Sequence, residues 1–490
     1  MLSKVLGVPR YFNALTERLV PSAPKERRKG KPWDRDVSAH IKNEFKSADF
    51  GDKRLNERLQ KIGIALGSTP SESIPKACED WASTKATYRF CDNENVNPKE
   101  ILSSHRKEQK SRLKGEEKVL VVSDTTFLTF PRHPSKEGLG DVGDSKTDVN
   151  GVLVHSTIGV HPETKRMTGV MDQQILIRDQ QSDKTKTYDT NGKGEPIQLK
   201  SEGEKWIRGD KRAIRMLPEE TRPIFIHDRE ADDFSLYTGL KDEDSGFVIR
   251  ASQNRCIRTP SGRKSHLFDW SKKLPEVGRT EIHVQQRRGR KSRKATLSIQ
   301  AGTCELLPPK NVPLEVSPCQ VNVVRVEEIE REENPISWVL LTTEPVKDFE
   351  GALKVIEFYR CRWKIEEWHK ALKTGCRIEE RQLEKWERME VLLSIYSIIA
   401  WKVLELREIA RGEEIPPEEF LTDVEIALLE KKFPELKGKG GKEYAIAIAK
   451  IGGYLDRSSD PPPEWIVMWR GFKEVQTWVE GIKILSPKTI

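Results

Sequence analysis

Two aspartates close apolar runs of this sequence, and a glutamate lies in a charged segment far downstream. Asp124 ends the run VLVVSD, Asp228 ends RPIFIHD, and Glu366 lies within YRCRWKIEEWHKALK at 359–373. A carboxylate at the end of an apolar strand is unfavourable unless it meets a cation or hydrogen-bond donors. Three carboxylates that a fold brings together bind hard divalent cations such as Mg²⁺, which keep waters and substrate phosphate as their other ligands. The chemistry indicated is in-line displacement at phosphorus.

Each aspartate taken alone has a simpler explanation. Asp124 precedes Thr125 and Thr126, and Asp228 precedes a predicted helix. A helix cap or a turn residue therefore accounts for either one. The combination of both strand ends with a glutamate on a later helix, packed on the same sheet, favours the metal-binding interpretation.

The segment 359–373 also carries a row of polar side chains at helical spacing. A helix from Asp348 to about Thr374 is predicted, and at ~100° per residue its polar row falls on one face. That row is Tyr359, Arg362, Glu366, Lys370 and Lys373. The apolar residues Phe358, Ile365, Trp368 and Leu372 fall on the face that would pack on a sheet. The row is either a solvated set of i,i+4 ion pairs or a surface for an anionic substrate.

Strands and helices alternate in the part of the chain that carries the two aspartates. VLVVSD, GVLVHSTIGV at 151–160 and RMTGVM are β-branched runs, and the turn HPETK at 161–165 makes them a three-strand meander. A helical segment at 201–217 leads to the strand at 222–228, a helix at 234–241 and a strand at 247–252. This order predicts an α/β fold with a mixed sheet. Between about 253 and 345 strands predominate, which indicates a β-rich insertion.

The sequence predicts helices near both ends of the chain. Apolar residues recur at helical spacing from Phe45 to about His105, and Arg54 and Arg58 lie one turn apart there. Near the other end, VLLSIYSIIAW at 391–401 reads as a buried helix, since it is well short of the ~20 residues that cross a bilayer. The last 75 or so residues are predicted to be helical, with anchors at Tyr444, Trp465, Trp469 and Trp478.

Composition places few limits on the partners. The chain has 490 residues, 36% of them hydrophobic, which predicts two to four domains of roughly 100–200 residues. The net charge is +8 although 33% of residues are charged, so a polyanion must be bound by local basic patches. KERRKGK at 25–31 reads as a solvated tail. RRGRKSRK at 287–294 is either a solvated edge or a phosphate contact.

Several classes of protein are not favoured. The N-terminus MLSKVLGVPRYFNAL has charges and a proline where a secretory signal requires an apolar run. Seven cysteines without a C-x-x-C pair predict neither a disulfide framework nor a zinc ribbon, and nine histidines show no H-E-x-x-H pattern. We therefore expect a cytoplasmic protein without a membrane span.

In order, the motifs resemble a known family. VSDTT, then HDREAD, then a β-rich insertion, then Y-x2-R-x3-E-x6-K are similar to the DDE transposases of bacterial insertion sequences, specifically the cut-and-paste group with a Tyr-Arg-Glu-Lys signature. The similarity runs from GDKRLNERL at 51–59 and ATYRFCDN at 86–93 to IAKIGGYLD and the tryptophan-rich end. It implies a ribonuclease H-like catalytic core with a β-rich insertion, between a helical N-terminal DNA-binding domain and a helical C-terminal dimerisation domain.

The resemblance also implies roles for single residues. Asp124, Asp228 and Glu366 would be the catalytic triad that binds Mg²⁺, with Mn²⁺ as a substitute. Phosphates of the transposon end would be gripped by Tyr359, Arg362, Lys370 and Lys373. Trp338 in PISWVLLTTEP matches a tryptophan that stacks on a flipped base, although strand packing explains it without the family. Trp363 lies on the signature helix. Arg54, Arg58 and Arg89 match positions of the family that recognise the transposon end.

The resulting prediction is a homodimeric enzyme that acts on double-stranded DNA. It would nick transposon ends, form and resolve a hairpin, and join the 3′-OH ends to target DNA with one carboxylate site. The expected domains are a basic arm at 1–34, a DNA-end-binding domain at 35–112, a catalytic domain at 113–411 and a dimerisation domain at 412–490. Two alternatives are a structure-selective nuclease on the same fold and a catalytically inactive DNA-binding regulator.

Overall fold

The computed structural model describes residues 37–133, 135–142, 149–179, 186–189, 196–284, 293–310, 316–329, 335–411, 415–458 and 460–485. The predicted arm at 1–34 lies outside these ranges. The described chain divides into two compact units. One holds Arg106 to His369, and the other holds the described residues up to His105 together with those from Lys370 onward.

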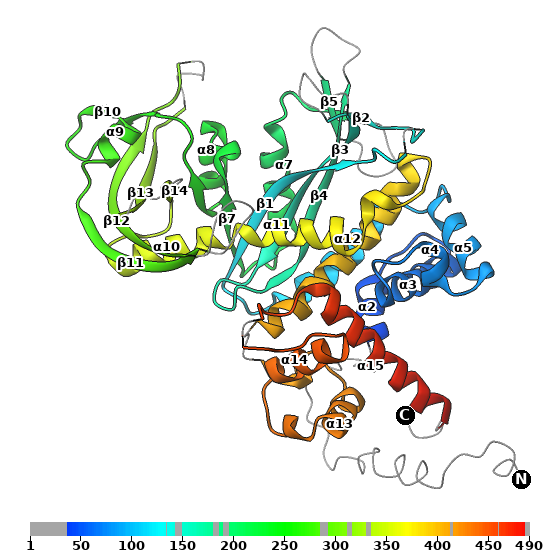
Figure 1. Ribbon diagram of the computed structural model, residues 1–490. Coiled ribbons are helices and arrows are strands. Elements are labelled where there is room, and N and C mark those ends of the chain that lie inside the picture. The colour runs from blue at the N-terminus through cyan, green and yellow to red at the C-terminus, as the bar shows by residue number, and fades with distance from the viewer. Residues whose placement is uncertain are drawn as a thin grey trace, which may run out of the picture. The chain divides into compact units, whose positions relative to one another are not determined.

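The centre of the first of these units is a mixed sheet (Figure 1). Strand β1 (Lys118–Thr129) pairs antiparallel with β3 (Asn150–Val160), which pairs antiparallel with β4 (Met167–Asp179). On its other side β1 pairs in parallel with β7 (Arg222–His227), and β7 pairs in parallel with β8 (Gly246–Arg250). The predicted meander and the predicted mixed sheet are therefore confirmed.

The central strands are buried because their sequences are apolar on both faces. All four residues of 119–122 in β1 are 0% exposed, and so are the three residues of 224–226 in β7. Continuous apolar runs of this kind are typical of strands that are covered on both sides. The turn between β3 and β4 reverses the chain at Lys165, which has a φ of 58°.

Helices cover the central strands. Helix α7 (Glu204–Met216) packs on β1, β3 and β4, whereas α10 (Phe349–Arg360) packs on β7 and β8. In Figure 1, α10 lies beside the strands of the β-rich insertion, and α11 (Trp363–Lys370) runs across the central strands. The short turn η1 (Arg229–Ala231) and α8 (Phe234–Asp242) connect β7 to β8. The middle of β1 and the ends of β7 and β8 are thus brought close to the segment that contains α10 and α11.

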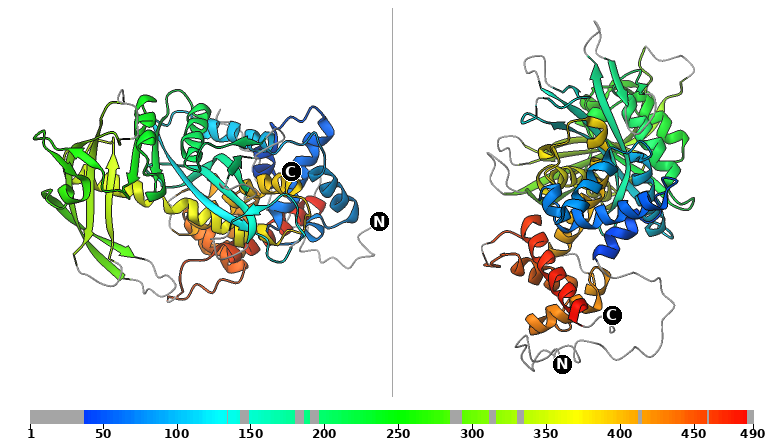
Figure 2. Two further views of the ribbon diagram at one scale, coloured as in Figure 1. Left: turned by 90° about the horizontal axis from the view of Figure 1, so that it is seen from above. Right: turned by 90° about the vertical axis from the view of Figure 1, so that its right-hand side faces the viewer.

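The β-rich insertion extends the same sheet beyond β8. Strand β14 (Ser337–Thr342) pairs with β8, and Figure 2 shows the insertion strands continuing past that edge. The other elements of the insertion are β9 (Cys256–Arg258), β10 (Lys264–His266), α9 (Leu267–Ser271), β11 (Glu276–Val284), β12 (Arg293–Leu306) and β13 (Cys319–Glu328). The short strands elsewhere are β2 (Gly140–Asp141), β5 (Lys186–Asp189) and β6 (Ile197–Gln198).

Most of the basic run RRGRKSRK lies outside the described residues. Its last two residues, Arg293 and Lys294, begin β12. The guanidinium of Arg293 donates from Nη2 to Glu328 Oε2 at 2.9 Å. Arg293 therefore serves an ion pair within the insertion.

The other unit is helical and combines both ends of the described chain. Its N-terminal helices are α2 (Val37–Phe45), α3 (Lys53–Ser68), α4 (Ile74–Cys78), α5 (Trp81–Cys91) and the first half of α6 (Pro98–Arg112). Its later elements are η2 (Ala371–Gly375), η3 (Ile378–Glu380), α12 (Trp386–Ala410), η4 (Pro417–Glu419), α13 (Asp423–Lys432), η5 (Pro434–Leu436), α14 (Gly441–Ile451) and α15 (Trp465–Leu485). We expected separate domains at 35–112 and 412–490, and their helices share this unit.

Contacts across long sequence separations hold this unit together. Arg388 of α12 donates to Asp92 at 2.6 Å, and the Trp469 indole donates to the carbonyl of Ser68 at 3.3 Å. The buried His105 bonds Glu44 at 2.5 Å and lies 5.0 Å from Trp401, between ring centroids. The whole run 391–401 is buried, as predicted. Within the described residues, no helix combines the length and apolar character that a membrane span requires.

Helices α14 and α15 cross at two glycines. A Cβ added to Gly471 would lie 1.7 Å from the carbonyl oxygen of Ile448, and one added to Gly452 would lie 1.8 Å from that of Val467. Both obstacles are backbone atoms, which cannot move aside as a flexible side chain does. The helices can therefore approach this closely only with glycine at both positions.

We predict that Gly471→Ala destabilises the protein by at least about 3 kcal/mol, because overpacking against backbone forces the two helices apart. The measurement is the free energy of unfolding in a denaturant titration. Gly481→Ala, in the same helix, is the control, since a Cβ there meets nothing within 4 Å. It is expected to stabilise the helix by about 0.5–1 kcal/mol. Equal effects of the two substitutions would contradict the close crossing.

The cysteines differ sharply in exposure. Six are buried and Cys256 is exposed. Burial raises the pKa of Cys91, Cys304 and Cys376 to about 12 in each case. We predict that a maleimide reagent, used near neutral pH, labels one thiol in the folded protein and seven thiols after unfolding. Mass spectrometry of the labelled peptides should identify Cys256, and a Cys256→Ser variant should remain unlabelled until it unfolds.

Candidate active site

The register of the central sheet brings Asp124 and Asp228 side by side. In the parallel pair, Val122 of β1 lies opposite Ile226 of β7. Two residues further along each strand, the same register aligns Asp124 with Asp228, the first residue after β7. Side chains two residues apart in a strand share a face. Both carboxylates therefore project from one face. Asp228 directly follows β7, as predicted, whereas the prediction that Asp124 ends its strand was wrong: β1 continues to Thr129, because the residues after Asp124 keep pairing with β3.

Burial and charge both act on Asp124. Burial raises the pKa of the Asp124 carboxyl to about 6; a hydrogen bond from the Thr125 N–H and the charge of Arg362 oppose this rise, and the negative charges of Asp228 and Glu366 add to it. The Thr125 N–H donates to Asp124 Oδ1 at 2.8 Å. These interactions place all three predicted carboxylates in one electrostatic cluster.

Arg362 lies between two members of that cluster. Its Nη2 is 2.8 Å from Glu366 Oε1, and its Nη1 is 3.8 Å from Asp124 Oδ2. The guanidinium also lies over the ring of Trp363, 4.6 Å from the centroid. The side chain of Arg362 is only 11% exposed, so its charge is well shielded from water. A cation thus already neutralises part of the carboxylate charge.

The sequence predicted one continuous helix over 348–374, and this prediction was wrong, because the segment forms separate helices. Helix α10 ends at Arg360 and α11 begins at Trp363. At this junction the N–H groups of Cys361, Arg362 and Lys364 bond carbonyls three residues back, as in a 3₁₀ turn. A 3₁₀ turn advances about 120° per residue. A helical wheel drawn at about 100° per residue therefore misplaces side chains on either side of the turn relative to each other. The pair Arg362–Glu366 survives, whereas Tyr359 leaves the polar row and is 4% exposed. The predicted apolar face, Phe358, Ile365, Trp368 and Leu372, is fully buried.

Tyr359 packs against two residues from the strands. Its ring lies edge-on to Trp338 of β14, with the centroids 5.2 Å apart. Burial raises the pKa of Tyr359, which the charges of Arg362 and Arg250 oppose, and Arg250 also bonds its hydroxyl. Arg250 ends β8 and donates to the carbonyl of Ser337 at 3.0 Å. Trp338 is only partly buried, which leaves ring surface accessible.

Arg250 was not selected from the sequence. A basic residue at the end of the apolar run FVIR was the available signal. Its position beside Tyr359 depends on the pairing of β8 with β14, which aligns Arg250 with Leu340. Local patterns do not reveal pairing between strands so far apart.

The donor set suits a hard divalent cation, since three carboxylates supply oxygen ligands of the kind that Mg²⁺ and Mn²⁺ prefer. Their mutual repulsion is relieved by positive charge, which Arg362 supplies in the structure. Searching the described residues finds no group of three or more His, Cys, Asp or Glu side chains arranged to hold a metal ion. The carboxylates would have to rotate toward one another, away from Arg362, to share an ion.

The two lysines of the signature belong to the other unit. Lys370 is exposed at the last residue of α11. Lys373 lies in η2, where its Nζ is 3.4 Å from Glu379 Oε1. Their phosphate-binding role stays a prediction.

The three predicted arginines of the helical N-terminal region lie on α3 and α5. Arg54, in the first turn of α3, has a side chain 91% exposed and bonds the helix cap Asp52. Arg58 lies one turn later, and its charge helps to lower the pKa of Asp80 after the larger effect of bonds from Ser83. Arg89 is exposed near the end of α5. Since Asp80 caps α5, Arg58 lies near the start of that helix.

The outward face of α5 also carries aromatic side chains that the sequence reading did not select. Trp81 is 74% exposed and Tyr88 36% exposed. Lys85 and Arg89 are exposed on the same side of the helix, while Thr84 and Thr87 face inward. Spacings of four and seven residues align these side chains along one helix face. We call Trp81, Lys85, Tyr88 and Arg89 the α5 face.

Comparisons with known protein families agree with both regions. Residues 38–96, which include α3 and α5, match the family model described as transposase DNA-binding. Residues 205–401, which include Asp228 and Glu366, match the transposase DDE domain. A DDE domain implies a ribonuclease H-like α/β fold and generally uses divalent metal ions; the mixed sheet described above is consistent with that fold. Together, the two matches support an insertion-sequence DDE transposase.

Proposed function

We propose that this protein carries out cut-and-paste transposition as a homodimer on DNA in the bacterial cytoplasm. The observation that carries the proposal is the alignment of Asp124 with Asp228 beside Glu366 and Arg362. In this proposal the protein belongs to the group with the Tyr-Arg-Glu-Lys signature. It binds two transposon ends, nicks them, releases the element through a hairpin and joins it to target DNA.

Asp124, Asp228 and Glu366 are the residues that would hold Mg²⁺, or Mn²⁺ in its place. A divalent cation bound there supplies positive charge to the attacking and leaving oxygens of the phosphodiester. The protein's own cations act on the same phosphate: Arg362 leaves its carboxylate partners and contacts a non-bridging oxygen, where negative charge develops. Arg250 and Tyr359 hold the adjacent phosphate. From the signature alone, Lys370 and Lys373 are proposed to bind phosphates of the transposon end.

Each chemical step is a displacement at phosphorus. In the nick, a water oxygen forms a bond to phosphorus and the 3′ oxygen leaves as the new 3′-OH. That hydroxyl then attacks a phosphodiester of the opposite strand, which forms the hairpin and expels the 3′ oxygen of the flanking DNA. A water oxygen then attacks the hairpin phosphodiester, and the 3′-OH of the element leaves again. Finally the 3′-OH attacks a target phosphodiester, and the 3′ oxygen of the target strand leaves. One set of carboxylates serves every step, because only the nucleophile changes.

Trp338 and Trp363 are proposed to contact the base that is flipped during hairpin formation. The partly exposed ring of Trp338 lies beside Tyr359, so a base stacked on it would leave its own phosphate close to Tyr359 and Arg250. Stacking of this kind contributes about 1–3 kcal/mol per base.

The test is a Mg²⁺-dependent assay on duplexes that carry the flanking end sequences of the element. The proposed function predicts nicked, hairpin and strand-transfer products that all require the metal ion. Cleavage without joining would instead identify a structure-selective nuclease. Binding without cleavage would identify a DNA-binding regulator.

The α5 face is proposed to bind the transposon end together with Arg54 and Arg58. Its aromatic rings and cations suit DNA, because cations neutralise phosphates and flat rings pack on bases or sugars. We predict that Trp81→Ala weakens binding of an end duplex about tenfold, measured by fluorescence anisotropy. Leu455→Ala, which removes another exposed apolar side chain (63% exposed), is the control and should bind normally. Unchanged binding by both variants would exclude Trp81 from the interface.

A further inference from the structure

The segment that follows Asp228 contains a second aspartate with a different environment. Asp232 lies four residues after Asp228 in the sequence HDREADD. Its side chain is 0% exposed, whereas that of Asp124 is 21% exposed. A fully buried carboxylate is tolerated only when hydrogen bonds and a cation compensate for lost hydration. The groups that surround Asp232 therefore indicate its role.

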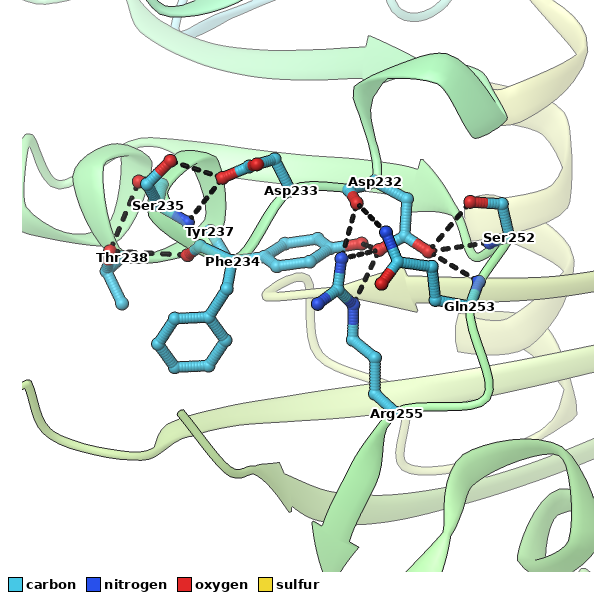
Figure 3. A network of polar contacts seen from close by, with 9 residues as sticks. All are labelled: Asp232, Asp233, Phe234, Ser235, Tyr237, Thr238, Ser252, Gln253 and Arg255. Atoms are coloured by element: carbon cyan, nitrogen blue, oxygen red, sulfur yellow. Dashed lines mark hydrogen bonds and ion pairs between the residues drawn. The ribbon is translucent and has the colours of Figure 1, made fainter. Parts of the chain in front are cut away.

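Donors occupy both carboxylate oxygens of Asp232 (Figure 3). Oδ1 accepts from the Tyr237 hydroxyl at 2.6 Å and from Arg255 Nε at 2.8 Å. Oδ2 accepts from the backbone N–H groups of Ser252 and Gln253, at 2.6 and 2.9 Å, and from the Ser252 hydroxyl at 3.2 Å. The backbone carbonyl of Asp232 accepts from Gln253 Nε2 at 3.1 Å and from Arg255 Nη2.

These bonds join two segments that follow neighbouring parallel strands. Asp232 belongs to the segment after β7, and Ser252, Gln253 and Arg255 belong to the segment after β8. Apolar packing resists separation but permits sliding, whereas directional bonds to one carboxylate fix both distance and orientation. Asp232 thus determines how the two strand ends are placed relative to each other.

Each strand end carries a residue of the proposed active site. The β7 end leads to Asp228, whose Oδ1 accepts from the Glu230 N–H at 2.8 Å. The β8 end is Arg250, which bonds Tyr359. A shift between the two segments would therefore move the Asp228 carboxylate relative to the side chains that are proposed to hold the substrate phosphate.

We propose that Asp232 is a positioning residue for metal binding and cleavage, acting through Asp228 on one side and through Arg250 and Tyr359 on the other. The proposal rests on the proposed function, since it takes Asp228 as a metal ligand. Asp232 contacts neither metal nor DNA. It holds the ligand and the phosphate-binding residues at the separation that the reaction requires.

The neighbouring Asp233 provides a matched control. It is exposed and caps α8, where Oδ1 accepts from the Ser235 N–H at 2.8 Å. Figure 3 shows it turned toward that helix, away from the Asp232 network. Asp232→Asn and Asp233→Asn therefore make the same chemical change one residue apart. Asn has a single acceptor oxygen, so it cannot accept at both positions that the Asp232 carboxylate fills.

The experiment uses the full-length protein and Mn²⁺ as the probe. Mn²⁺ affinity is measured by calorimetry without DNA, affinity for an end duplex by anisotropy without metal, and cleavage in single turnovers. For Asp232→Asn we expect a 10- to 100-fold loss in both Mn²⁺ affinity and cleavage rate, roughly the effect of removing an outer-shell partner. Duplex affinity should change less than about twofold. Asp233→Asn should match wild type in all three measurements.

Loss of a buried charge can also unfold the protein, so a milder variant accompanies the first. Tyr237→Phe removes one bond to Oδ1 and leaves the Arg255 ion pair intact. It should remain folded by circular dichroism and still weaken Mn²⁺ binding several-fold, about what one hydrogen bond to a charged group contributes. The double variant Asp232→Asn with Arg255→Gln removes both charges; it should regain thermal stability without regaining Mn²⁺ affinity.

The outcomes distinguish failure of the positioning role of Asp232 from failure of the proposed function. Wild-type Mn²⁺ affinity and cleavage in folded Asp232→Asn or Tyr237→Phe would overturn the positioning role and leave the proposed function standing. Recovery of Mn²⁺ affinity together with stability in the double variant would also overturn it, since stability alone would then explain the loss. A wild-type protein that neither binds Mn²⁺ nor cleaves would overturn the proposed function itself.

Discussion

Glu366→Gln is expected to lower cleavage and strand transfer by at least about 1,000-fold while DNA binding is retained. The substitution keeps the shape of the side chain and removes a charged oxygen ligand, and a metal ion contributes several kcal/mol to stabilising the phosphoryl transition state. It also removes the negative charge that pairs with Arg362 at 2.8 Å, so the guanidinium should turn further toward Asp124. Single-turnover cleavage of an end duplex, with anisotropy for binding, measures both effects.

The adjacent Glu367 provides the control for that experiment. It lies one residue further along α11, outside the Arg362 pair. Glu367→Gln should cleave at a rate close to that of wild type. If Glu366→Gln cleaved as fast as wild type, Glu366 would be removed from the active site and the proposed mechanism would fail. Loss of DNA binding in Glu366→Gln alone would instead indicate a folding defect.

Arg362→Gln is the second substitution with a large expected effect. We expect cleavage to fall about 100- to 1,000-fold, the usual result of removing one preorganised donor from a developing oxyanion. Mn²⁺ affinity should be retained or increased, because the variant lacks the cation that now lies between Asp124 and Glu366. A lower cleavage rate without a loss of Mn²⁺ affinity distinguishes a phosphate contact from a purely structural ion pair.

Arg360→Gln is the matched control for Arg362, since Arg360 is the exposed last residue of α10. It should behave like wild type in both assays. A parallel loss of Mn²⁺ affinity and cleavage in Arg362→Gln would show that the guanidinium supports the carboxylates rather than the substrate. Equal losses in the two arginine variants would point to a general charge effect.

The central sheet and its two aspartates could be predicted because local sequence determines them. The apolar runs before Asp124 and Asp228 are long enough to specify buried strands. The polar residue after the run marks the strand end at Asp228 but not at Asp124, where β1 continues to Thr129. Their alignment depends in addition on the parallel pairing of β1 with β7, which local sequence does not specify. Glu366 was found by its spacing from Arg362, which depends only on one turn of helix.

The features that were missed depend on contacts between distant parts of the chain. Arg250 meets Tyr359 because β8 pairs with β14, and Asp232 meets Arg255 across two connecting segments. The break between α10 and α11 has no proline or glycine to mark it. Wheel geometry therefore placed Tyr359 on an exposed row, although its ring packs against Trp338.

The helical unit has a consequence for the order in which the chain folds during synthesis. Its N-terminal helices leave the ribosome first, but partners such as Arg388 and Trp469 follow 296 and 401 residues after the groups they bond. The middle of the chain, Arg106 to His369, is synthesised before the later helices, and compact units of a chain generally fold while translation continues. The unit that holds Asp124, Asp228 and Glu366 is therefore synthesised before the helical unit is complete, and a chain terminated before Lys370 would lack α12 to α15.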